Sequence, residues 1–176
     1  GERAADQEGA ERGQARVTVI RAFVRKIHAL TQARHVPLSL DVFGVAAFNL
    51  PEDVGALGQD LVELAKHSEA IAPMVYPSNY AKGFHGFAEP GDHPEITGIG
   101  TKAAVEVVRK SGPGAAIIRP WLQAMNYKQS NFGPKYVADQ ARTTDEGGGV
   151  GWMLWNPGEG YDPCYNAFPV TARKAH

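Results

Sequence analysis

Apolar residues recur every three or four positions between Val17 and Leu30, which predicts an amphipathic helix with one face on a core. After it, short apolar runs alternate with longer helix-like stretches. The runs, each predicting a strand, lie at 38–44, 70–77, 115–121 and 150–155. The helices expected between them cover about 49–66, 101–111 with Thr101 as cap, and 134–147. Residues 1–15 are polar and without this period, so we expect a flexible lead-in or loop there.

Strands that alternate with helices at this spacing predict an α/β fold with about four parallel strands joined by right-handed crossovers. The run at 115–121 is almost continuously apolar, as in a strand covered on both faces. With 176 residues, the chain is shorter than the roughly 250 typical of a complete eight-stranded barrel. The domain at 16–176 is therefore either half of a barrel or a small open sheet.

Charge and composition exclude several classes of function. Eighteen basic residues face nineteen acidic ones, so the sequence makes no electrostatic case for a nucleic-acid or membrane-surface partner. No apolar run approaches the roughly 18 residues of a membrane span, and no signal-peptide pattern opens the chain. The single cysteine and the histidine spacing give no basis for a metal site. We expect no cofactor either, since neither a phosphate-binding loop nor a dinucleotide fingerprint occurs.

Ligands of parallel α/β folds bind outside the carboxyl ends of the strands, so the polar and aromatic residues at these ends are the candidate site. They are Asp41, Tyr76, Ser78, Tyr80, Arg119, Trp121, Gln123, Trp155 and Asn156. Aromatic faces stack on sugar rings, while guanidinium and amide groups bind hydroxyls, so this mixture suits a carbohydrate. Asp41 is the candidate general acid or nucleophile, and the others are candidates for substrate binding.

Each of these residues also has a purely structural interpretation. Asp41 would then cap a loop, and Arg119 would form an ion pair with Asp41 or another acid at the strand ends. The tryptophans and tyrosines would pack on the core or its rim. Gln123 and Asn156 would satisfy backbone groups of the loops.

Several motifs in order make the chain resemble a family of bacterial glycoside hydrolases, formerly a domain of unknown function and distantly similar to α-amylase-type barrels. The motifs read DVFG at 41–44, GQDL at 58–61, PMVYPSNY at 73–80, RPWLQ at 119–123 and GWMLWN at 151–156. The resemblance covers roughly 17–160 and implies the C-terminal half of a (β/α)8 barrel that hydrolyses a polysaccharide with carboxylates. It also implies an exported or cell-envelope location.

The chain departs from the family pattern at two places. The family usually has His where Asn79 stands, and its earlier half contains a strand ending in a Phe-Asp-Tyr-x-Arg-Phe-Pro motif that is missing here. Glycosidases generally use two carboxylates. The resemblance therefore implies a catalytically incomplete chain, unless a second chain or copy completes the barrel. The alternative function is a carbohydrate-binding or scaffolding barrel without catalysis.

Overall fold

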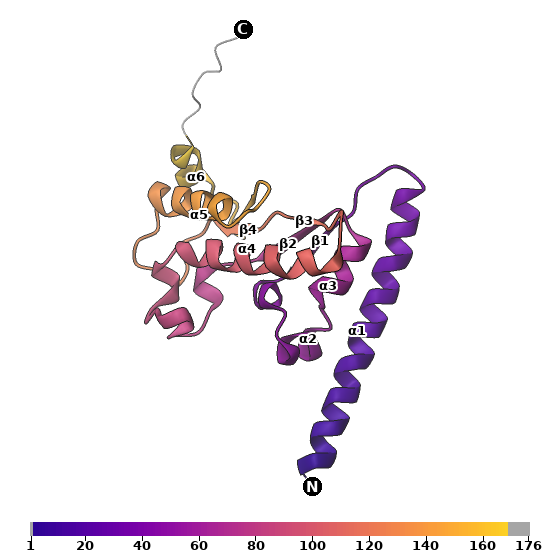
Figure 1. The fold of residues 1–176 in the computed structure, drawn as a ribbon. Coiled ribbons are helices and arrows are strands. Elements are labelled where there is room, and N and C mark those ends of the chain that lie inside the picture. Colours follow the sequence, from indigo (N-terminus) through magenta and orange to yellow (C-terminus); the bar gives the residue numbers. More distant parts are fainter. Residues whose placement is uncertain (1, 169–176) are drawn as a thin grey trace.

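The computed structural model describes residues 2–168, with side chains from residue 8 on. Figure 1 shows a long first helix followed by alternating strands and helices. The strands are β1 (Ser39–Phe43), β2 (Ala70–Met74), β3 (Ile117–Ile118), β4 (Trp121–Gln123) and β5 (Met153–Trp155). The helices are α1 (Glu2–Gln32), α2 (Pro51–Leu57), α3 (Leu61–Leu64), α4 (Glu95–Val108), α5 (Pro134–Glu146) and α6 (Asp162–Ala167). The mixture of helices and parallel strands is compatible with the expected α/β class. The last part of the expected domain, 169–176, lies outside the described residues.

All described strand pairs are parallel, but they form two sheets, β1-β2-β3 and β4-β5. The single strand expected at 115–121 is divided at Pro120, which has no N–H to donate. Before the division, the Arg119 N–H donates to Ile71 O of β2; after it, Pro120 O accepts from the Met153 N–H of β5. At Pro120 the chain therefore stops pairing with β2 and begins to pair with β5. The described strands form open sheets, not a closed barrel.

Helix α1 begins at Glu2, so residues 2–15 are helical where the sequence pattern predicted a flexible lead-in or loop over 1–15. Around Gly13, the helix packs against α2. The backbones approach so closely that a Cβ on Gly13 would lie 2.9 Å from the Gly55 Cα. Arg16 Nη1 donates to Gly55 O at 3.0 Å. Packing through glycine uses no large apolar side chains, so it leaves no apolar period in the sequence.

Helix α4 begins at Glu95, six positions before the expected cap at Thr101. Thr101 is fully buried inside the helix, and its hydroxyl donates to Thr97 O at 2.7 Å. The stretch before Thr101 contains Gly98 and Gly100, which hid its helical character from the sequence pattern. Tight packing needs both glycines, because a Cβ there would clash with Thr143 and Val75.

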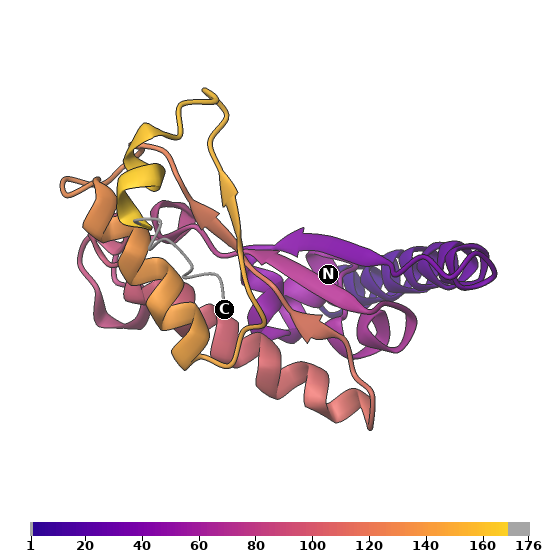
Figure 2. The same cartoon turned by 90° about the horizontal axis from the view of Figure 1, so that it is seen from above.

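The two faces of the sheet β1-β2-β3 differ in their cover. Val42, Ile71 and Ile118 belong to a core packed with residues of α1, α3 and α4. Along β1, in contrast, Ser39, Asp41 and Phe43 are exposed. Figure 2 looks down on this second face, and no described helix covers it. We call it the open face.

Candidate active site

Asp41 and Trp121 meet at the open face although they are far apart in the sequence. The Trp121 Nε1–H donates to Asp41 Oδ1 at 2.9 Å. Asp41 lies on β1 and pairs with Ala72 of β2, whereas Trp121 lies on β4 of the other sheet. Asp41 Oδ2 accepts no hydrogen bond from the described residues. The carboxylate is therefore oriented through one oxygen and free to act through the other.

Trp155 extends this group. Its ring centroid lies 6.1 Å from that of Trp121, edge to face at 81°. The parallel pairing of β4 with β5 places the two residues next to each other. Trp155 remains 44% exposed, so a large apolar surface faces solvent beside the carboxylate. An exposed indole next to polar groups is the usual geometry for stacking on a sugar ring.

Tyr76, just past the end of β2, lies behind the carboxylate. The side chain is buried, and burial raises the pKa of its hydroxyl well above the ordinary value, helped by the negative charge of Asp41 and by Tyr161. Tyr76 is therefore a neutral phenol, able to donate a proton in a hydrogen bond near Asp41.

Arg119 does not form the structural ion pair with Asp41. Its Nε–H instead donates to Val150 O at 3.2 Å, which links the turn before β5 to the end of β3. The side chain is exposed and forms no salt bridge with a described carboxylate. Its remaining N–H groups are available to a ligand.

Gln123 and Ser78 are buried residues that share a hydrogen bond. Gln123 is fully buried. Its Oε1 accepts from the Ser78 N–H at 3.2 Å, and its Nε2 donates to Met125 O, Tyr127 O and Gln129 Oε1. Every polar atom of Gln123 thus has a protein partner, and the residue organises loops. The Ser78 hydroxyl is also buried and has no hydrogen-bond partner.

Tyr80 and Asn156 likewise serve loop structure. The Tyr80 ring stacks on Phe84 at 4.1 Å and meets Phe48 edge-on. Its hydroxyl is buried and unpartnered, and burial raises its pKa. Asn156 accepts from the Gly158 N–H at 2.8 Å and donates to Gly160 O at 2.6 Å, which shapes the turn after β5. Asn156 thus satisfies backbone groups of its own turn, whereas Tyr80 contributes a packed ring.

The sequence pattern missed Gln140 and Gln129, which support this region. Fully buried Gln140 of α5 accepts from the Gln123 N–H and donates to Gln123 O, both at 2.9 Å. Gln129 donates to Met125 O at 2.7 Å. A polar residue on the apolar face of α5 was the available signal, but its partner could not be named without the fold.

Within residues 2–168, no group of three or more His, Cys, Asp or Glu side chains is arranged to hold a metal ion. Among the described helices, none is both long enough and apolar enough to cross a membrane.

The model of a family described as "putative glycosyl hydrolase domain" matches residues 2–161. No curated protein and no solved structure matches the chain.

Proposed function

The chain belongs to this glycosyl hydrolase domain family, and from that membership we propose that Asp41, Trp121 and Trp155 form part of a polysaccharide-hydrolysing site. The fold we propose for the complete site is a (β/α)8 barrel, of which the described strands are one half. Because a fold alone does not establish activity, the proposal rests on the site.

The observation that supports it best is the hydrogen bond from Trp121 to Asp41 with Trp155 alongside. One oxygen of the carboxylate is held in place by Trp121, and the exposed indole of Trp155 lies beside Trp121. A sugar ring stacked on the exposed indole of Trp155 would bring its glycosidic oxygen or anomeric carbon toward Asp41 Oδ2. Asp41 then acts as general acid or as nucleophile, while Tyr76 and Arg119 donate hydrogen bonds to sugar oxygens.

A glycosidase needs a second carboxylate, about 5–5.5 Å from the first for retention of configuration and farther for inversion. Asp41 is the one carboxylate among the strand-end candidates. We propose that a second protein segment, from another chain or a second copy, covers the open face and supplies this group. The unpaired edges of the open sheets favour such an association.

Reducing-sugar release from bacterial and plant polysaccharides tests the activity. In the longest natural form of the protein, Asp41→Asn should lower the rate by about 10²–10⁴-fold, the usual contribution of an acid–base group. Asp145→Asn, at an exposed position on α5, is the control and should retain the rate. An Asp41→Asn variant as active as its parent would exclude Asp41 from the chemistry.

Trp121→Phe keeps an aromatic ring but removes the N–H that orients Asp41. The expected fall in rate is about tenfold, since a hydrogen bond to a charged group contributes about 1.5–3 kcal/mol and this one is partly exposed. The matched control is Trp152→Phe, whose ring stacks on Phe168 away from Asp41. Equal rates for both variants would show that the Trp121 N–H has no part in positioning.

The second candidate function is carbohydrate binding without hydrolysis, favoured by the single carboxylate of the site. Saturable quenching of Trp121 and Trp155 fluorescence by oligosaccharides, with no reducing-sugar release from any form of the protein, would support it. In that case Asp41→Asn would weaken binding only slightly.

A further inference from the structure

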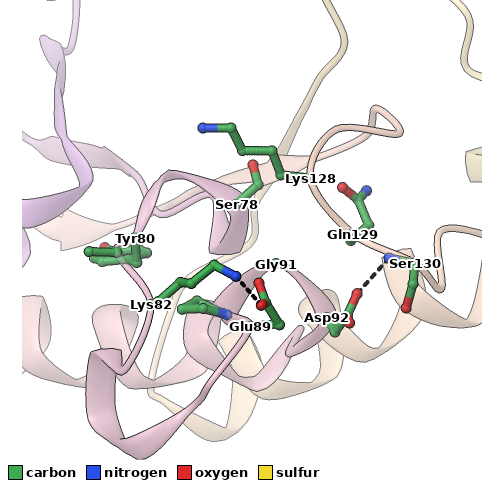
Figure 3. A pocket seen from close by; sticks show the side chains of 11 residues that line it. Ser78, Tyr80, Lys82, Glu89, Gly91, Asp92, Lys128, Gln129 and Ser130 are labelled. Atoms are coloured by element: carbon green, nitrogen blue, oxygen red, sulfur yellow. Dashed lines mark hydrogen bonds and ion pairs between the residues drawn. The ribbon is translucent and has the colours of Figure 1, made fainter.

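A hollow of about 660 Å³ lies between the segment that follows β2 and the loop that follows β4. Figure 3 shows its lining side chains, which come from both walls. The polar and charged ones are Ser78, Lys82, Glu89, Asp92, Lys128, Gln129 and Ser130. Of the strand-end aromatic candidates, Tyr80 also lines the hollow, whereas Tyr76, Trp121 and Trp155 do not.

The two walls are joined by direct contacts. Gly91 packs against the backbone of Lys128 so closely that a Cβ would lie 1.8 Å from Lys128 O. The Ser130 N–H donates to Asp92 Oδ1 at 2.5 Å, drawn as a dashed line in Figure 3. From below, the buried Tyr136 hydroxyl donates to Gly91 O at 2.7 Å. The hollow therefore has fixed walls.

The loop above it is also held in one conformation. The amides of Gln123 and Gln129 bind the loop carbonyl groups of Met125 and Tyr127. At the tip, Lys128 has a positive φ of 52°, which a non-glycine residue rarely adopts. A preformed hollow binds a ligand without the cost of ordering its own loops.

The charges of the lining balance. Lys82 forms an ion pair with Glu89, and Asp92 uses one oxygen for the Ser130 N–H. Lys128 lies over the Tyr127 ring at 5.0 Å and has no carboxylate partner among the described residues. The lining thus contains two lysines and two carboxylates, so its formal charges cancel. Some hydrogen-bond donors and acceptors of these groups are not used by the described part of the protein. This balance disfavours a strongly anionic ligand and suits one that is uncharged and rich in hydroxyl groups.

We propose that this hollow is a further sugar subsite, which takes an uncharged unit of the polysaccharide bound at Asp41. The inference rests on the proposed function. Tyr76, beside Asp41, and Ser78, in the lining, are two residues apart, so their Cα atoms are at most about 7 Å apart. The hollow therefore begins close to the open face, so a sugar chain bound at Asp41 would have to span only a short distance to reach it.

Calorimetric titration with neutral cello-, malto- and chito-oligosaccharides tests the subsite, comparing disaccharides with hexasaccharides. Lys128→Asn removes the amine, and Asn tolerates a positive φ. Ala81→Trp fills the hollow from its lining without removing any polar group. The control is Lys110→Asn, at an exposed position after α4.

The wild type and the control should bind a hexasaccharide at least tenfold more tightly than a disaccharide, and both hollow variants should lose this gain. A gain that persists in both variants would overturn the subsite but leave the proposed function intact. Loss of the gain in these variants, with Trp121→Ala binding unchanged, would support the subsite and overturn the proposed site at Asp41. Failure of every oligosaccharide to bind the wild type would overturn both.

Discussion

The covered and open faces of the sheet are built from the same strands but have different roles. On the covered face, Val42, Ile71 and Ile118 are almost completely buried against helices. On the open face, Phe43 is 55% exposed, and the exposed Asp41 carboxylate accepts a hydrogen bond from Trp121. Burial on one face provides the stability that allows polar and aromatic groups to be held in place on the other. Three measurements, ordered by the size of the expected effect, test this division.

Truncation of one side chain on each face gives the largest contrast. Ile71→Ala removes a completely buried side chain and should lower the free energy of unfolding by about 2–5 kcal/mol. Phe43→Ala should change it by less than about 1 kcal/mol, because the ring is already mostly hydrated. Urea unfolding followed by circular dichroism measures both. Equal losses would mean that the open face is covered in solution, and sedimentation at several concentrations would then reveal a second copy.

Gln140 tests whether polar groups in the buried part of the protein need hydrogen-bond partners. Gln140→Leu leaves the backbone N–H and C=O of Gln123 without their partners and should cost about 1–3 kcal/mol of unfolding free energy. Gln32→Leu, at the exposed end of α1, is the control and should change the same quantity little. If both substitutions had the same small effect, the amide would merely fill space.

Glu69, directly before the central strand β2, gives the smallest expected effect. Hydrogen bonding to the Leu38 N–H, and then to His28, lowers the pKa of its carboxyl group. The ionised form is thus favoured in the folded protein, so its contribution is present at neutral pH. That contribution is lost as the pH falls below the ordinary value of 4.5 and through the lowered pKa.

The urea midpoint of Glu69→Gln should therefore fall less between neutral and acidic pH than that of the wild type. Glu106→Gln, at an exposed position on α4, serves as the comparison and should follow the wild type. Parallel curves for all three proteins would show that the bond to Leu38 adds no pH-dependent stability.

The candidate site could be predicted only in part from the sequence, because the position of a residue at a strand end does not fix its hydrogen-bond partners. The strand-end rule placed Asp41, Trp121 and Trp155 in one set, and the structure brings them together. The same rule also selected Gln123 and Asn156, whose polar atoms are used by their own loops. Position in a strand says where a side chain begins, whereas its hydrogen-bond partners depend on loops that fold over it.

By itself, the sequence determined the class of the fold and most of its elements, because apolar spacing reflects which residues must leave water. It correctly placed β1, β2, β5 and α5 to within a few residues. Only the tertiary structure decided that α1 extends to Glu2, that Pro120 divides a strand between two neighbours, and that one face stays open. These features depend on contacts between distant segments, on the N–H group that Pro120 lacks, and on whether a helix packs against the second face of the sheet. A local apolar pattern contains no information about any of them.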